Sequence, residues 1–221
     1  MPNLLFIIVL SYLVGSIPIS IMLTKFVKGV DIRNFGSGNA GGTNVSRILG
    51  KKYGVLVILF DAMKGVVAVV FISRLYFGSF PFPNTTPFDD FTLIQIIAGI
   101  SAVIGHIWTI FASFKGGKGI ATGLGVLISI VTLDLLMALG VFLVVMYISK
   151  YISLASISAA VSVPLIMIIR ENIFGVDIQS YHTVLPFVIA LALLIIYTHR
   201  SNLERLFAGS ESKISLSKKN K

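Results

Sequence analysis

The sequence predicts an all-α integral membrane protein with about seven transmembrane helices, roughly two or three of them short or partial. Apolar residues make up 56% of the 221 residues and charged residues only 12%, and the mean hydropathy is +0.95. Several apolar runs approach the ~20 residues that a membrane-spanning helix needs. The polar segments between them are too short to bury a core, so we expect one membrane domain.

Composition also limits the chemistry. The chain has no cysteine, which excludes disulfides, thiolate metal ligands and a cysteine nucleophile, and its 3 histidines are scattered. We therefore expect no metal site and no other cofactor. A net charge of +9 would suggest nucleic acid as the partner of a soluble protein. In a membrane protein, loops that face anionic lipid or anionic substrates explain it better, so no nucleic-acid partner is expected.

The apolar runs follow one another along the whole chain. The first has no basic segment before it and no small-residue cleavage site, so we expect a retained helix rather than a removed signal peptide. The loop 78–91 contains neither lysine nor arginine. In order, the runs cover residues 4–24, 53–77, 92–114, 120–133, 135–149, 152–169 and 183–198.

Two of these runs look too short to cross a bilayer. Asp134 separates them, and helices of about 14 and 15 residues reach only about 21 to 23 Å. A hydrocarbon core is about 30 Å thick, so these helices must thin the bilayer, lean on neighbours or form a hairpin that does not fully cross. The alternative is a chain with about five crossings, in which 120–149 forms one hairpin-like insertion.

Positive charge predicts the orientation. With the N-terminus outside, every lysine and arginine except Arg74 and Arg170 falls on the inner side, which satisfies the positive-inside rule. The alternative with fewer crossings also keeps the basic groups inside. We expect a polytopic membrane domain over 1–208, a polar basic cytoplasmic tail over 209–221, and three polar stretches that meet at the cytoplasmic surface.

The first polar stretch covers residues 31–47 and is rich in glycine. Gly36, Gly38 and Gly41 match the G-x-G-x-x-G dinucleotide fingerprint, but a transmembrane helix precedes them instead of a strand, so we reject that interpretation. Glycines still let backbone N–H groups approach an anion, and Arg47 can grip a phosphate with two hydrogen bonds. Side-chain donors nearby are Ser37, Asn39, Thr43 and Asn44. A flexible loop whose polar residues satisfy one another is the alternative.

Asp61 and Lys64 lie inside an apolar run, where each charge alone would cost about 3 kcal/mol. Because they are spaced i, i+3, they can pair on one helix face. A structural ion pair explains them, and contact of Lys64 with a substrate is the alternative.

The second polar stretch, 105–122, is not a Walker loop, because Lys118 is followed by glycine instead of serine or threonine. It nonetheless offers two ammonium groups, glycine amides and the start of a helix, all of which favour phosphate. The candidate phosphate-binding residues are Lys115, Gly116, Gly117, Lys118, Gly119 and Thr122. A basic stop-transfer loop is the alternative, and His106 is either a buried structural histidine or part of the site.

The third polar set is split in sequence. Ser153 lies at the start of the sixth apolar run, and His199 and Asn202 follow the seventh, spaced so that they share a helix face. Glu204 makes H-x-x-x-x-E with His199, which we treat as coincidence. No aspartate is placed to orient His199 in a triad, so we expect Ser153 to act as a hydrogen-bond donor, and a nucleophilic role is the alternative. Interfacial anchoring is the alternative role for His199 and Arg200.

Together the three stretches resemble the acyl-phosphate:glycerol-3-phosphate acyltransferase family, PlsY, of bacterial membrane enzymes. Three motifs in order, at family spacing, carry the resemblance over most of the chain. The matching residues are Asp31, Ile32, Arg33, Gly36, Ser37, Gly38, Asn39, Gly41, Thr43, Asn44, Arg47, then Gly105, His106, Phe114, Lys115, Gly116, Gly117, Lys118, Gly119, Ala121, Thr122, then Ser153, Leu154, His199, Arg200, Asn202, Arg205, Leu206, Gly209 and Glu211. The chain departs from the family at Gly42, usually alanine, and at Trp108-Thr109, usually phenylalanine-proline.

The resemblance implies that an acyl phosphate donates its fatty acyl group to the primary hydroxyl of glycerol 3-phosphate, yielding lysophosphatidic acid and phosphate. Lys115, Lys118 and Arg47 would hold phosphate groups, while His199 is the best side chain for a general base, in competition with the leaving phosphate itself. Ser37, Asn39, Ser153 and Asn202 would orient the substrates. The expected setting is the bacterial inner membrane, with the acyl tail in lipid, the active site at the cytoplasmic face and an upstream acyl-phosphate-producing enzyme as a candidate docking partner.

Two other functions remain open from the residues alone. A transporter for a small organic phosphate would also use broken helices and glycine loops, but would line a path across the membrane with basic groups. A structural protein that binds anionic lipid through its basic tail would leave the three motifs unexplained.

Overall fold

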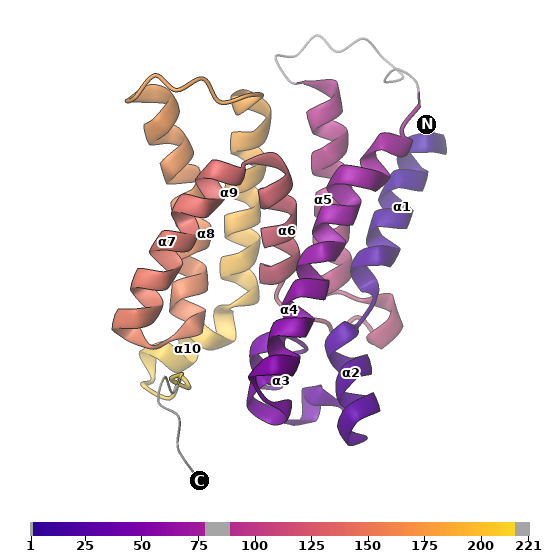
Figure 1. Ribbon diagram of the computed structural model, residues 1–221, viewed down its shortest axis with the longest axis vertical. Coiled ribbons are helices and arrows are strands. Elements are labelled where there is room, and N and C mark those ends of the chain that lie inside the picture. Colours follow the sequence, from indigo (N-terminus) through magenta and orange to yellow (C-terminus); the bar gives the residue numbers. More distant parts are fainter. Residues whose placement is uncertain (1, 78–88, 215–221) are drawn as a thin grey trace. The chain divides into compact units, whose positions relative to one another are not determined.

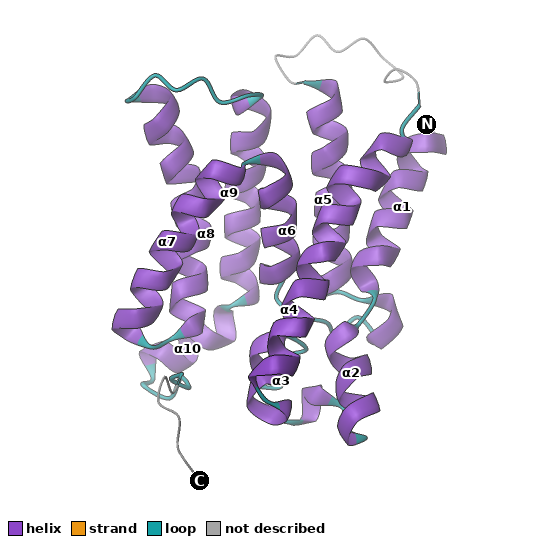
Figure 2. Ribbon diagram, in the orientation of Figure 1, coloured by secondary structure: helices purple, strands orange, loops and turns teal. Residues whose placement is uncertain are grey.

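The structure is a computed structural model that describes residues 2–77 and 89–214. Within these ranges the chain forms helices and connecting turns without any strand, so the predicted all-α class is confirmed (Figure 2). Most of the predicted loop 78–91 and the end of the predicted basic tail lie outside the described residues. The chain divides into two compact units, Met1–Val131 and Thr132–Lys221.

The described part of unit 1 contains six α-helices (Figure 1). In this unit α1 packs along α5, and α4 packs against both α3 and α6. A core cluster that includes Ile7, Ala68 and Ala102 joins α1, α5 and the continuation of α4. The six helices are α1 (Pro2–Ser16), α2 (Ile19–Lys28), α3 (Gly42–Leu49), α4 (Lys51–Val66), α5 (Asp90–Ile107) and α6 (Ile120–Ile130).

The first apolar run is broken, which the sequence analysis did not foresee. The helix stops at Ser16 and restarts at Ile19, and Pro18, which has no N–H to donate to the preceding turn, stands directly before the second helix. The break leaves two carbonyl groups to be satisfied. Thr109 Oγ1 donates to the carbonyl of Ser16, and Lys64 Nζ donates to that of Ile17 at 2.5 Å.

The helix α4 does not end as an α-helix. It continues as a π-helical segment, Val67–Ile72, and then a 3₁₀ turn, Ser73–Leu75. Ser73 Oγ donates to the Val69 carbonyl at 2.6 Å and so satisfies one acceptor in the widened turn. The residues Ala68 and Ile72 of this segment are buried in the core of unit 1.

Unit 2 contains α7 (Thr132–Ser149), α8 (Ile152–Asn172), α9 (Tyr181–Thr198) and the short α10 (Arg200–Phe207). The predicted break at Asp134 is wrong, because α6 already ends at Ile130 and Asp134 lies in the first turn of α7. Its carboxylate accepts a hydrogen bond from Arg170 Nη1 of α8 at 2.8 Å, so an ion pair satisfies the charge that suggested a boundary.

All seven predicted apolar runs form helices, but their lengths differ from those expected. Among the described residues, 6 helical spans are long and apolar enough to cross a membrane, and they include the 18-residue α7, which was expected to be short. Only α6, with 11 residues, stays short. At 1.5 Å per residue it reaches about 17 Å, roughly half of a hydrocarbon core.

Candidate active site

The first glycine loop, residues 29–41, is organised by its own side chains. Asp31 accepts hydrogen bonds from the backbone N–H of Arg33 at 3.1 Å and from its guanidinium at 2.6 Å. These hydrogen bonds from Arg33 hold the pKa of Asp31 below its usual value, against the opposing effect of burial. Arg33 Nη1 also donates to the Ala112 carbonyl at 2.8 Å, which ties this loop to the second glycine loop, residues 108–119.

Asn44 holds the turn of the first glycine loop in place. Its Oδ1 accepts from the Ser37 N–H at 3.0 Å, and its Nδ2 lies within hydrogen-bond distance of the carbonyls of Phe35 at 2.8 Å and Asn39 at 3.1 Å. Asn44 is 1% exposed. The sequence analysis predicted a substrate donor here, but the structure engages this amide with backbone groups.

The other predicted donors of this stretch remain accessible. The side chains of Ser37 and Arg47 are exposed, and those of Asn39 and Thr43 are partly buried. Gly36 has a φ of 60°, a left-handed conformation that glycine adopts readily, and a Cβ there would run into Asn44 Oδ1. The loop therefore presents Ser37 and Asn39 from a backbone that Asn44 fixes.

The second glycine loop uses two of its amides internally. The N–H of Gly116 donates to the Ile107 carbonyl and the N–H of Gly117 to the His106 carbonyl, both at 3.0 Å. The sequence analysis assigned these amides to phosphate, but the structure shows that they bond the end of α5. The two glycines are instead required for close packing, because a Cβ at Gly116 would meet the His106 carbonyl oxygen.

The start of α6 remains the best anion-binding feature of unit 1. Gly119 precedes it with a φ of 85°, and the first N–H groups of any helix lack acceptors within that helix. Lys115 is exposed and Lys118 is partly buried, and they precede the first residue of this helix by five and two positions. Thr122 lies in the first turn, fully buried, and its Oγ1 has no hydrogen-bond partner among the described residues.

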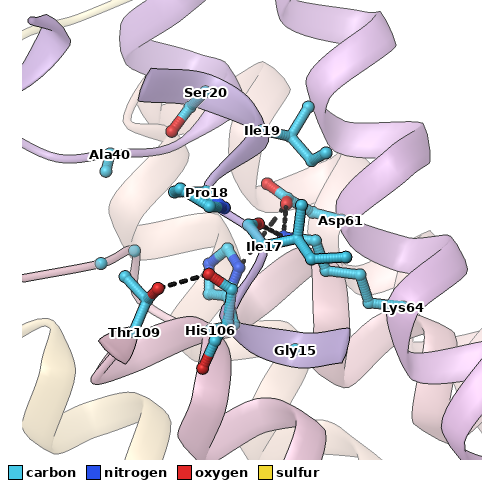
Figure 3. A pocket seen from close by; sticks show the side chains of 13 residues that line it. Gly15, Ile17, Pro18, Ile19, Ser20, Ala40, Asp61, Lys64, His106 and Thr109 are labelled. Carbon is cyan, nitrogen blue, oxygen red and sulfur yellow. Dashed lines mark hydrogen bonds and ion pairs between the residues drawn. The ribbon is translucent and has the colours of Figure 1, made fainter. Parts of the chain in front are cut away.

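A buried polar cluster lies behind the second glycine loop (Figure 3). Lys64 Nζ is 2.7 Å from Asp61 Oδ1, and His106 Nδ1 is 3.6 Å from the same oxygen. Lys64 is 6% exposed and bonds the Ile17 carbonyl as well, so the structure accounts for it as a structural ion pair without any substrate. A small pocket adjoins the cluster, lined among others by Pro18, Ala40 and Thr109.

The polar groups of unit 2 converge on Glu211. Its Oε1 accepts from Ser153 Oγ at 2.8 Å and from Asn202 Nδ2 at 2.7 Å, while Oε2 accepts from Arg205 Nε at 2.7 Å. Burial would raise the pKa of Glu211, but the hydrogen bonds from Asn202, Ser153 and Arg205 outweigh it and hold the pKa below its usual value. Ser153 is thus bonded to a carboxylate and not to a histidine.

His199 lies at the junction of α9 and α10 and is 4% exposed. Its Nδ1 is 2.8 Å from the Ile195 carbonyl, an acceptor that favours the tautomer with a proton on Nδ1 and a lone pair on Nε2. The carbonyl of His199 accepts from the N–H of Asn202 at 2.8 Å, so the same residue begins α10. The predicted pair of His199 and Asn202 is therefore held in one turn.

Glu211 and Arg205 are the residues that the predicted site omitted. Both belong to the family pattern found in the sequence, which was the available signal. Spacing alone does not reveal that a segment after α10 returns to the start of α8, where the N–H of Ile214 donates to the Lys150 carbonyl at 2.8 Å. In the described part of the chain, no group of three or more His, Asp or Glu side chains gathers that could hold a metal ion.

Comparison with known proteins gives consistent results. A family model described as "Glycerol-3-phosphate acyltransferase" matches residues 5–209. The glycerol-3-phosphate acyltransferase of Chlorobaculum tepidum is 46% identical over 239 residues, which cover 100% of each chain. That of Chlorobium chlorochromatii is 45% identical and covers 99% of this chain and 100% of its own.

Solved structures extend the likeness to the fold. The crystal structure of PlsY (YgiH), an integral membrane glycerol 3-phosphate acyltransferase, in its glycerol 3-phosphate form has a TM-score of 0.79 and 37% identity, covering 96% of both chains. The lysophosphatidic acid form of PlsY gives 0.78 and 36%, with 96% of this chain and 95% of the other covered. The predicted integral membrane fold is thereby confirmed, and the chain belongs to the glycerol-3-phosphate acyltransferase (PlsY) family.

Proposed function

We propose that this chain transfers a fatty acyl group from acyl phosphate to the primary hydroxyl of glycerol 3-phosphate, giving 1-acyl-glycerol 3-phosphate and phosphate. Membership of the chain in the PlsY family supports acyl phosphate as the donor, and the bonding of Ser153 supports direct transfer. Ser153 Oγ donates to Glu211, and the chain has no cysteine, so neither Ser153 nor a thiol serves as the nucleophile of a covalent acyl intermediate. An activated donor with a good leaving group does not need one.

The reaction balances as a direct substitution at the acyl carbon. The hydroxyl oxygen of glycerol 3-phosphate bonds to that carbon, and the bond from the carbon to the phosphate oxygen breaks, with its electron pair leaving on phosphate. The hydroxyl proton passes to His199 Nε2, whose lone pair follows from the contact of Nδ1 with the Ile195 carbonyl. We assign Asn202, whose amide carries two N–H groups, to orienting the acyl oxygen. Ser153 donates to Glu211, the carboxylate that also accepts from Asn202, so we assign Ser153 to positioning Asn202 through that carboxylate.

In this proposal, groups of unit 1 bind phosphate. Lys115, Lys118 and Arg47 supply positive charge, and the start of α6 supplies backbone N–H groups beside Thr122. Ser37 and Asn39 donate from the first glycine loop. We assign Asn44, Lys64, Gly116, Gly117 and Gly119 to shaping these loops. The polar groups of the first four already bond other protein groups, and Gly119 has a left-handed backbone conformation.

The setting follows the predicted orientation. We propose that the protein lies in the bacterial inner membrane as a multi-pass protein, with 1–208 as the membrane domain, 209–221 as the tail and the active site at the cytoplasmic face. Both substrates carry phosphate and the donor carries an acyl chain, so a site at the membrane surface lets the chain remain in lipid. The donor must come from a reaction that makes an acyl phosphate, and the enzyme of that reaction is the proposed docking partner.

The direct test uses purified protein in lipid nanodiscs supplied with acyl phosphate and labelled glycerol 3-phosphate. We expect labelled lysophosphatidic acid and one equivalent of phosphate, with acyl-CoA inactive as a donor. Folded protein that makes product from acyl-CoA but not from acyl phosphate would overturn the choice of donor. Folded protein that uses neither donor would overturn the enzymatic function.

The role of His199 has its own test. Replacing His199 with alanine should lower kcat by about a hundredfold or more, because general-base catalysis contributes at least that much. His182→Ala is the matched control, since His182 is exposed near the start of α9. A near-normal kcat for His199→Ala would instead assign the proton to the oxygens of the leaving phosphate.

A further inference from the structure

Three titratable side chains are buried together in unit 1, and the proposed reaction uses none of them. Asp61 and Lys64 come from α4 and His106 from the last turn of α5, with exposures of 2%, 6% and 7% (Figure 3). Removing such groups from water is costly even when they are paired. The contacts of these side chains with the helix break and the second glycine loop suggest a specific role.

One side of the cluster supports the break between α1 and α2. Lys64 Nζ donates to the Ile17 carbonyl at 2.5 Å and to Asp61 Oδ1 at 2.7 Å. Asp61 is thereby fixed in position by a charge-assisted hydrogen bond, and it faces His106 Nδ1 at 3.6 Å. The imidazole ring therefore lies opposite a carboxylate that α4 carries and that Lys64 links to the broken helix.

The other side of the cluster contacts the second glycine loop. The His106 carbonyl accepts the N–H of Gly117 at 3.0 Å, and a Cβ added at Gly117 would run into His106 Nε2. The same Cβ would lie 3.0 Å from the Ala40 carbonyl oxygen of the first glycine loop. Gly117 is thus enclosed between the imidazole and the first loop, one residue before Lys118.

We propose that His106, oriented by Asp61 and Lys64, is a positioning residue that seats the second glycine loop against Ala40 and so sets where Lys115 and Lys118 present their ammonium groups. This inference rests on the proposed phosphate-binding role of these lysines. It assigns the buried cluster to substrate affinity through the loop, although none of its three side chains touches a substrate. A cluster that only stabilised the helices would change unfolding without changing substrate affinity.

The test compares His106→Leu, which keeps the volume but removes both ring nitrogens, with His106→Asn, whose amide replaces Nδ1 and can still donate to Asp61. In the acyl phosphate assay we expect His106→Leu to raise the KM of at least one substrate about tenfold or more while kcat changes less than about threefold. His106→Asn should keep both KM values within about threefold of the parent protein. His182→Leu, the same change at an exposed site, should leave them unchanged.

A second readout does not depend on turnover. The chain has 1 tryptophan, Trp108, two residues beyond His106 and held through its carbonyl by the Tyr12 hydroxyl at 2.8 Å. Titration with glycerol 3-phosphate should change its fluorescence in the parent protein, with a midpoint about tenfold higher in His106→Leu if the loop holds this substrate.

The outcomes separate this inference from the proposed function. If folded His106→Leu matches the parent protein in both KM values, the positioning role is wrong while the enzymatic function stands. If the parent protein makes no product, the enzymatic function fails instead. Should His106→Leu not fold, Gly117→Ala probes the same contact from the loop, because its methyl group meets Nε2, and unchanged KM values there would equally overturn the inference.

Discussion

Single buried polar residues fix the local geometry of the candidate site residues within each unit. Asn44 illustrates why sequence reasoning identifies such residues without identifying their role. Its position in a glycine-rich stretch predicts a donor, and it is one, but its partners are the carbonyls of Phe35 and Asn39. Whether an amide meets the backbone or a ligand depends on how the loop folds back, which residue types at a given spacing do not specify.

Glu211 permits a prediction about pH. Because its pKa is held below the usual value of 4.5 in the folded protein, its stabilising contribution is complete above the unfolded pKa and is lost as pH falls through the folded one. Glu211→Gln should therefore have a lower unfolding midpoint than the parent protein at pH ~7, and the difference between the two midpoints should become smaller in acid. Thermal unfolding in detergent from neutral pH to below the usual value measures both midpoints.

Glu204→Gln provides the control for this series, since Glu204 is exposed on α10. Its midpoint should follow the parent protein at every pH. A gap between Glu211→Gln and the parent protein that stays constant into acid would show that the charge of Glu211 does not contribute to stability.

At the scale of helices, glycines bring backbones together. A Cβ at Gly125 of α6 would run into the Ala62 carbonyl of α4, and one at Gly65 of α4 would run into the Thr122 carbonyl of α6. Such small residues let membrane helices pack at short distance. Gly125→Ala should therefore destabilise the protein by about 1–3 kcal/mol through overpacking, seen as a lower unfolding midpoint.

The control is Gly140→Ala in α7, where a Cβ would meet nothing within 4 Å. Alanine favours a helix over glycine by about 1 kcal/mol, so this variant should be neutral or slightly more stable. Equal effects of the two substitutions would argue against close packing of α4 and α6.

The position of the apolar runs was sufficient to predict each long helix among the described residues. The runs did not predict where one helix ends and the next begins, because a charge inside an apolar run has more than one explanation. Asp134 suggested a boundary but lies in the first turn of α7, where its carboxylate forms an ion pair with Arg170 of α8. Pro18 was a stronger signal for a break, because it cannot donate the backbone hydrogen bond of a continuous helix, although Pro164 and Pro186 lie inside α8 and α9. Tertiary pairing of this kind is invisible in a single sequence.

At the scale of the whole molecule, the orientation remains a prediction that can be measured. The chain contains no cysteine, so single cysteines can be introduced without removing any. Asp177 and Glu204 are both exposed, in the turn before α9 and on α10 respectively. With the N-terminus outside, a membrane-impermeant maleimide should label Asp177→Cys in spheroplasts and Glu204→Cys only after permeabilisation.

The parent protein, which cannot be labelled, is the blank for this experiment. Labelling of Glu204→Cys in sealed spheroplasts, with Asp177→Cys protected, would reverse the orientation. It would then place the proposed phosphate-binding loops away from the cytoplasm. Equal labelling of both positions in sealed spheroplasts would contradict a membrane crossing by α9, which lies between them.

The π-helical segment that continues α4 lies where the helix passes from one structural role to another. Before it, Asp61 and Lys64 form the buried ion pair near the loops, and inside it, Ala68 and Ile72 pack in the core with α1 and α5. One residue more or less in an ordinary helix rotates everything beyond it by about 100°. A wide turn already holds a surplus residue and can absorb such a change locally. We therefore expect insertions and deletions among relatives to occur at Val67–Ile72, so that the residues before and after this segment keep their packing partners.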